Sequence, residues 1–363
     1  MATRAEHPAA ARHGSIVEPT TTARIGWIDA ARGLAILLVV FGHASGGLID
    51  ARGPGFLVPL RYVFLGIYTF HMPVFFFLAG LFVEQRLRNG TGAFLRRLLK
   101  TIVWAYFLWS FIQFSLIYAL GSLVNHPASG YWRTIIALPW SAVSQFWFLQ
   151  ALFLIHLVAI LAWRLGGTRA VLGAAILLKL LALFVPSTAA LSLAAGNGPY
   201  YALGMMLGWE RSSHLLAHAS SQLRAAIFVG AAAALWLLCS HADTMQPLIN
   251  IETASSAGIA RVAWMPAMLP SALLGGAALL LLAEWLSRVP AGVAHMVEFL
   301  GSMTMPIYLL HVLFAAGTRI LLIRLGFSDL AILPALVAAG VAGPLLVRRA
   351  TDRLRLTSLL ALR

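Results

Sequence analysis

Charged side chains are scarce in this 363-residue sequence, and that scarcity excludes most classes of protein. Asp, Glu, Lys and Arg together make up 10% of the residues, whereas a typical soluble domain carries about 25%. A soluble enzyme, a disordered chain and a collagen-like or coiled-coil protein are therefore excluded. Apolar residues reach 60% and the mean hydropathy is +0.86, so the composition indicates an integral membrane protein.

Cysteine is almost absent as well. The single cysteine, Cys239, lies in an apolar segment, which excludes an intrachain disulfide and a cysteine-rich metal site. We predict no metal cofactor. Residues 1–24 contain no continuous apolar segment, so they do not have the pattern of a cleaved secretory signal. We interpret them as a flexible cytoplasmic tail.

Apolar segments separated by charged residues, glycine or proline predict the fold class, an all-α bundle of about ten transmembrane helices. The predicted transmembrane domain covers residues 25–348, and residues 349–363 form a basic cytoplasmic tail. Glycine and proline at 196–199 are expected to interrupt one span and to mark the wall of a cavity. The spans are centred on 34–49, 68–84, 101–120, 144–163, 168–185, 188–208, 225–241, 265–285, 299–318 and 330–347.

The basic residues divide unequally between the two sides of such a bundle. With an even number of spans, 19 Lys and Arg lie on the side of both termini, six lie on the other side, and Lys179 lies within a span. This distribution predicts that both termini are cytoplasmic. It also explains the net charge of +14 without a nucleic-acid partner.

Arg32 and His43 are the most informative ionisable residues of the first span. They are 11 residues apart, which is about 20° more than three helical turns, so they share one helix face about 16 Å apart along the axis. A guanidinium binds phosphate well, and an imidazole can take a proton from a hydroxyl. The alternative is that Arg32 anchors the helix at the membrane boundary and His43 is a hydrogen-bonding partner in helix packing.

Six segments with distinctive residues follow one another along the chain. They are Asp29–Gly33 with His43, Tyr68–Gly80, Phe94–Tyr106, Phe146–Leu149, Tyr200–Gly204 and Gly301–His311. In this order they resemble membrane acyltransferase family 3, and the resemblance covers residues 25–320. The sequence of the first two segments is most similar to the branch of fucose 4-O-acetylase-like enzymes and exopolysaccharide or Nod-factor O-acetyltransferases. Ala79 stands where the family usually has serine.

The resemblance implies transfer of an acyl group, usually acetyl, from cytoplasmic acetyl-CoA to a sugar hydroxyl of a lipid-linked or exported bacterial glycan. The expected location is the bacterial inner membrane, and a polysaccharide assembly complex is a further expected partner. His43 would act as general base or accept the acyl group covalently. Arg32, Arg96, Arg97 and Lys100 would bind the coenzyme A phosphates.

Further side chains are candidates for substrate contact or support. Asp29 would orient Arg32, and His71, Trp147 and Tyr308 are candidate donors to a developing oxyanion. The alternative for His71 is a hydrogen bond to the backbone carbonyl that Pro73 leaves without a donor. His311 carries both a functional and a packing interpretation. Alternatives to the enzyme are a transporter or flippase of a lipid-linked sugar, and a structural subunit of a polysaccharide assembly complex. The lack of an internal repeat weakens the transporter hypothesis.

Overall fold

The computed structural model describes residues 25–53, 58–127, 129–184, 190–240, 258–289 and 292–362. These residues fold almost entirely into helices, and no strand is present among them. In the first half of the chain the helices are α1 (Gly26–Arg52), α2 (Val58–Gly80), α3 (Val83–Arg88), α4 (Thr91–Leu98), a π-helical turn (Leu99–Val103), α5 (Trp104–Leu120), α6 (Tyr131–Ala137) and α7 (Trp147–Leu181). The second half contains α8 (Ala190–Ala217), α9 (Ser221–Ser240), α11 (Gly258–Leu286), α12 (Val293–Ser302), α13 (Thr304–Arg324) and α14 (Asp329–Arg353).

The helices confirm the predicted fold class. In the described part of the chain, eight helical segments are long and apolar enough to cross a membrane, so the protein is an all-α integral membrane protein. The predicted number of about ten spans and the cytoplasmic position of the termini stay predictions. The predicted tail at 1–24 lies outside the described residues.

Helix α7 contains two of the predicted spans, because it bends sharply at Gly166 and Gly167. Both glycines have non-helical backbone angles, and Gly167 has a φ of 64°, a conformation that favours glycine. The bend lies between the predicted spans 144–163 and 168–185, so each of these spans corresponds to one half of α7.

The expected interruption at 196–199 is wrong, because α8 is helical across these residues. Pro199 lacks the backbone N–H that would bond to the carbonyl oxygen of Ala195, and a neighbouring helix contacts the next carbonyl along the chain. Lys179 of α7 donates from Nζ to the carbonyl oxygen of Gly196 at 2.9 Å, and the same ammonium lies 5.1 Å from the ring centre of Tyr200. The polar residues therefore support helix packing here rather than a break.

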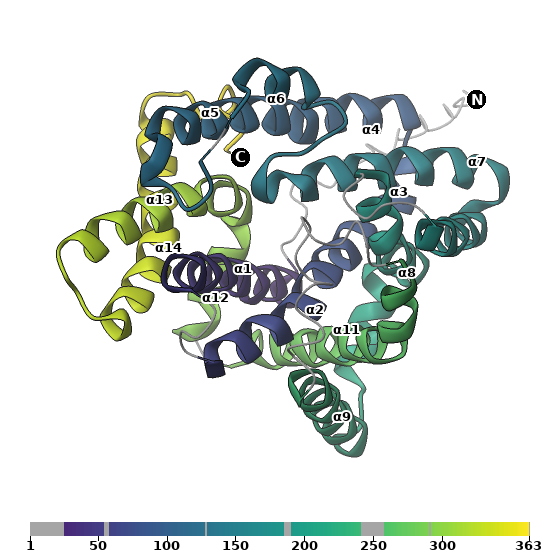
Figure 1. The fold of residues 1–363 in the computed structure, drawn as a ribbon. Helices are drawn as coiled ribbons and strands as arrows, with labels where there is room; N and C mark the ends of the chain where they lie inside the picture. Colours follow the sequence, from purple (N-terminus) through teal and green to yellow (C-terminus); the bar gives the residue numbers. More distant parts are fainter. Residues whose placement is uncertain are drawn as a thin grey trace, which may run out of the picture.

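Helix α1 lies near the middle of the bundle and packs against α2, α11, α12, α13 and α14 (Figure 1). Its contact with α12 depends on two glycines. A Cβ at Gly33 would lie 2.0 Å from the carbonyl oxygen of Val297, and one at Gly301 would lie 1.8 Å from the carbonyl oxygen of Asp29. The two backbones therefore touch, and this contact brings α12 beside the start of α1.

The C-terminal segment after α14 packs against α5. The indole nitrogens of Trp104 and Trp109 donate to the carbonyl oxygens of Leu359 and Leu360 at 2.7 and 2.8 Å. Leu362 is fully buried. This end of the chain is therefore part of the packed structure. Its cytoplasmic position stays a prediction from the basic residues of the sequence.

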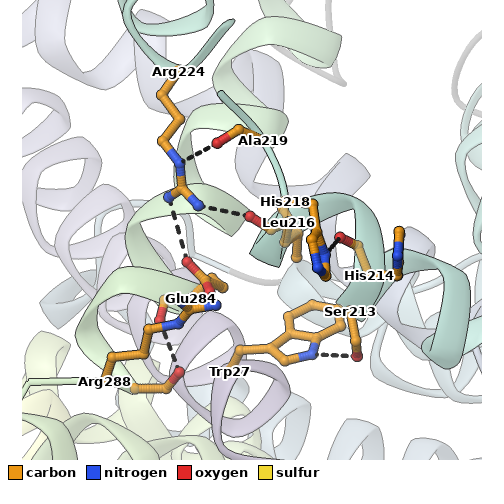
Figure 2. A network of polar contacts seen from close by, with 10 residues as sticks. Trp27, Ser213, His214, Leu216, His218, Ala219, Arg224, Glu284 and Arg288 are labelled. Carbon is orange, nitrogen blue, oxygen red and sulfur yellow. Dashed lines mark hydrogen bonds and ion pairs between the residues drawn. The ribbon is translucent and has the colours of Figure 1, made fainter. Parts of the chain in front are cut away.

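A network of polar contacts joins α8, α9 and α11 (Figure 2). Arg224 of α9 donates to the carbonyl oxygens of Leu216 at 2.7 Å and Ala219 at 3.0 Å, and its Nη1 lies 3.3 Å from Glu284 Oε2. Glu284 is 4% exposed and also pairs with Arg288. Arg224 thus caps the end of α8 while it neutralises a carboxylate buried in α11.

Replacing Arg224 by alanine is expected to lower the free energy of unfolding by about 1–3 kcal/mol, because buried oxygen atoms would lose their donor. The matched control is Arg288→Ala. The Arg288 side chain is 58% exposed, so its removal should cost about 0–1 kcal/mol. Thermal unfolding of the detergent-solubilised protein measures both, and equal losses in the two variants would contradict the proposed role of Arg224.

Candidate functional site

A cavity of about 280 Å³ lies along α1, and its residues come from five helices. At one end it reaches Arg32, and farther along α1 it reaches Val39. Because Val39 precedes His43 by four residues, the cavity runs from Arg32 toward His43 and ends about one helical turn before it. The lining residues are Arg32, Val39, Met72, Phe75, Leu78, Ala79, Phe148, Gly301, Ser302, Thr304, Met305 and Tyr308.

Arg32 lies at the polar end of this cavity. Its Nη1 donates to Oδ1 of Asp29 at 3.2 Å, and the two side chains are 35% and 12% exposed. Asp29 thus holds the guanidinium in one orientation, which is the geometry that the three-residue spacing predicts. Arg32 keeps further donors for a ligand, because a guanidinium has five N–H groups and one carboxylate oxygen accepts only part of them.

The other predicted phosphate-binding residues follow at the end of α4. Arg96, Arg97 and Lys100 are exposed, and Lys100 lies in the π-helical turn after α4. None of the three has an ion pair in the described part of the chain. Among them, Arg97 is connected electrostatically to the cavity end, through a residue that sequence reasoning did not select.

That residue is Arg86 of α3. Its half-buried guanidinium lies close enough to Arg32 and Arg97 for the like charges to repel each other. No carboxylate pairs with Arg86 among the residues that the structure describes. The central carbon of its guanidinium, Cζ, lies 6.0 Å from the ring centre of Phe82. Among the described residues, Asp29 is the carboxylate that pairs with these three guanidinium groups, so the region is strongly positive. Such a region favours a polyanionic ligand.

His43 lies beyond the cavity in a cluster of rings from α1, α2 and α13. The ring centre of His311 is 4.9 Å from that of His43, and Tyr68 is 6.3 Å away. Tyr68 in turn lies 4.9 Å from His71. His43 is half-buried, whereas His71 and His311 are 2% and 0% exposed. Of the three imidazoles, His43 is therefore the one that a substrate can reach.

Tyr68 is a second residue that sequence reasoning did not select. Its ring fits against α1 because Gly42 has no side chain: a Cβ there would lie 2.8 Å from Tyr68 Cε2. In the sequence, the one sign that a side chain packs closely against α1 here was Gly42, which directly precedes His43. His71 donates from Nδ1 to the carbonyl oxygen of Ile67 at 2.7 Å, within its own helix, and not to the carbonyl that Pro73 leaves without a donor.

Of the predicted support residues Tyr308 and Trp147, the first lines the cavity and the second does not. Tyr308 lines it, but its hydroxyl donates to the carbonyl oxygen of Gln145 at 2.5 Å. Because the hydroxyl proton is already in a hydrogen bond with a backbone carbonyl, the arrangement does not favour Tyr308 as an oxyanion donor. Trp147 is half-buried against Phe76, 6.4 Å between ring centres, and the neighbouring Phe148 lines the cavity instead.

No group of three or more His, Cys, Asp or Glu side chains suited to a metal ion is present in the described part of the chain. The arrangement combines a positive end, a largely apolar cavity and, about one helical turn beyond it, a half-buried imidazole. Chemically, it can bind an anionic group at one end and remove a proton, or form a bond to nitrogen, at the other.

Comparison with known proteins gives one family match and one relative. Residues 25–349 match the family described as "Acyltransferase domain". Nodulation protein NolL of Mesorhizobium japonicum is 28% identical over 132 residues, which is 35% of this chain and 32% of NolL. The match thus spans about a third of that relative's length. No solved structure matches.

Proposed function

This chain belongs to the acyltransferase domain family, which its residues 25–349 match, and from that premise we propose which groups it transfers. The protein is a multi-pass membrane acyltransferase. We propose that it moves an acyl group, with acetyl as the proposed group, from cytoplasmic acyl-CoA to a sugar hydroxyl of an exported or lipid-linked bacterial glycan. The bacterial inner membrane is the proposed location.

The observation that carries this proposal is the cavity between Arg32 and the neighbourhood of His43. Coenzyme A has a highly charged nucleotide end and a long, narrow arm that ends in the thioester. The axial separation of about 16 Å between Arg32 and His43 suits a ligand of that kind. Apolar side chains such as Phe75, Leu78 and Phe148 along the channel favour the uncharged arm over a second charged group.

The donor phosphates would bind at the arginine end. Arg32, Arg86 and Arg97 supply charge-assisted hydrogen bonds, which are stronger than neutral ones. Arg96 and Lys100 lie on the same short segment and would extend the positive surface. Binding of phosphate would also relieve the repulsion between the guanidinium groups.

Two observations support a glycan as the acceptor, namely a sequence resemblance and the name of one relative. The first two matching segments resemble those of exopolysaccharide and Nod-factor O-acetyltransferases, and NolL is named a nodulation protein. The sugar would reach His43 from the surface opposite the arginines. Trp132 and Trp140, 70% and 63% exposed, are available for stacking on a sugar ring or for the membrane interface.

The proposed chemistry uses one nitrogen of His43. As a general base, His43 removes the proton of the sugar hydroxyl while the oxygen attacks the thioester carbonyl. In the covalent alternative, the same nitrogen first attacks the carbonyl and the acyl group then passes to the sugar. In both routes the C–S bond breaks and coenzyme A leaves with a free thiol.

Acetyl-CoA labelled in its acetyl group tests the proposal with the full-length protein in lipid nanodiscs. We expect release of free coenzyme A thiol, together with transfer of label to glycan from a membrane extract that contains lipid-linked sugars. An Arg32→Ala variant should lose most of both signals. Movement of unmodified lipid-linked sugar across a vesicle membrane, without thiol release, would instead support a flippase and contradict the proposal.

A further inference from the structure

His43 and His311 form a pair across two helices that are far apart in the sequence. Nε2 of His311 lies 3.3 Å from Nδ1 of His43, and the rings meet edge to face at an interplanar angle of 68°. His311 is fully buried, while His43 is half-buried. The pair therefore has one inner ring, which no substrate can touch, and one outer ring, which a substrate can reach.

The hydrogen-bond partners determine where the protons of the pair lie. Nδ1 of His311 faces two carbonyl oxygens, those of Ile307 at 3.0 Å and Tyr308 at 2.8 Å. Carbonyl oxygens only accept, so this nitrogen carries the proton and Nε2 of His311 has a free lone pair. Nδ1 of His43 faces that lone pair and the carbonyl oxygen of Val39 at 3.0 Å. It must therefore be the donor.

We infer that His311 is a positioning residue, which holds His43 in the tautomer that presents an unprotonated Nε2 to the substrate. This inference rests on the proposed function, because it assigns His43 the reacting nitrogen. A second shared hydrogen bond restricts rotation of the ring, and a buried acceptor stabilises the positive charge that His43 gains during the reaction. His311 acts through His43 and touches neither donor nor acceptor.

The same arrangement serves both routes of acyl transfer. As a base, His43 Nε2 takes the hydroxyl proton, the sugar oxygen bonds to the carbonyl carbon, the C–S bond breaks, and the thiolate takes the proton from Nε2. In the covalent route, Nε2 bonds to the carbonyl carbon and the C–S bond breaks. The sugar oxygen then bonds to that carbon, the Nε2–C bond breaks, and the hydroxyl proton goes to the thiolate, which leaves as the thiol. In each case His43 becomes positively charged while Nδ1–H keeps donating to Val39 and His311.

Replacing His311 by leucine and by glutamine separates this role from simple packing. His311→Leu has no acceptor, and we expect kcat with acetyl-CoA to fall about 5- to 30-fold, because only the Val39 carbonyl still accepts from His43. The KM for acetyl-CoA should change less than about twofold. His311→Gln has an amide oxygen near the position of Nε2 and should restore most of kcat. Equal losses in the two variants would overturn the inference.

A double-variant cycle distinguishes failure of this inference from failure of the proposed function. In a His43→Ala background, His311→Leu should cause no further loss of activity, because the residue acts through His43. Additive losses would overturn the positioning role. Full activity of His43→Ala alone would instead contradict the proposed mechanism.

Nitrogen NMR of protein labelled with ¹⁵N-histidine tests the pair without any substrate. The signal missing in His43→Gln identifies His43, and we expect its Nδ1 to be protonated, its Nε2 to be unprotonated, and the Nδ1 resonance to shift in His311→Leu. His156→Gln is the matched control, because His156 is also buried and donates from Nδ1 to a carbonyl four residues earlier, at 2.6 Å. A protonated Nε2 on His43, or the same shift in both variants, would overturn the inference.

Discussion

Replacing His43 by alanine is expected to lower the rate of acyl transfer by about 100- to 10,000-fold, the usual contribution of a positioned general base. The loss should fall on kcat, because His43 lies one helical turn beyond the cavity and away from the arginines that would bind the phosphates. Release of coenzyme A thiol from acetyl-CoA, measured over a range of acetyl-CoA concentrations, separates kcat from KM.

The His43→Ala protein should remain folded, since the ring is half-buried and its helix is held by many other contacts. Unchanged thermal unfolding would show this. His126→Ala is a suitable control, because His126 is a histidine with a 72% exposed side chain. Comparable losses of activity in the two variants would contradict a specific role for His43.

Replacing Arg86 by glutamine is expected to raise the KM for acetyl-CoA by about 10- to 150-fold, the effect of losing a charge-assisted hydrogen bond of about 1.5–3 kcal/mol. The effect should be on binding, because Arg86 belongs to the arginine group far from His43. Direct titration of acetyl-CoA onto the purified protein, alongside the kinetics, measures it.

Arg88→Gln is the matched control for this prediction. Arg88 is on the same short helix, but its side chain is 69% exposed and already pairs with Glu84 at 2.7 Å. It should change KM less than about twofold. A similar effect of both substitutions would mean that Arg86 contributes only to the general positive surface, and unchanged affinity in Arg86→Gln would remove it from the donor site.

Helical periodicity was enough to predict that Arg32 and His43 lie on the same face of one helix. Arg32 and His43 lie on one uninterrupted helix, and an 11-residue spacing in such a helix brings them to the same face whatever surrounds it. The position of Asp29 beside Arg32 follows from the same rule. The membrane class likewise follows from composition, because few charged residues leave no way to cover a water-facing surface.

Contacts between distant segments could not be predicted in this way. His311 is 268 residues from His43 in the sequence, yet the two rings are in contact. Tyr308 was a candidate oxyanion donor by sequence, but its hydroxyl donates to the carbonyl oxygen of Gln145 in the fold. By sequence Arg86 did not differ from the other basic residues near it, because its position near Arg32 depends on how α3 packs within the bundle. The break expected at 196–199 was wrong, because α8 continues through these residues, and the contact that Lys179 of another helix makes there was equally invisible in the sequence.

The sequence by itself determined that this protein is a helical membrane acyltransferase with a basic residue and a histidine on one face of its first helix. Those features depend on composition, local spacing and ordered segments, which are properties of the chain alone. The tertiary structure decided which rings surround His43, which arginines join Arg32 and where the cavity runs. These depend on helix packing, and the close contact of α1 with α12 through Gly33 and Gly301 shows that small residues set such distances.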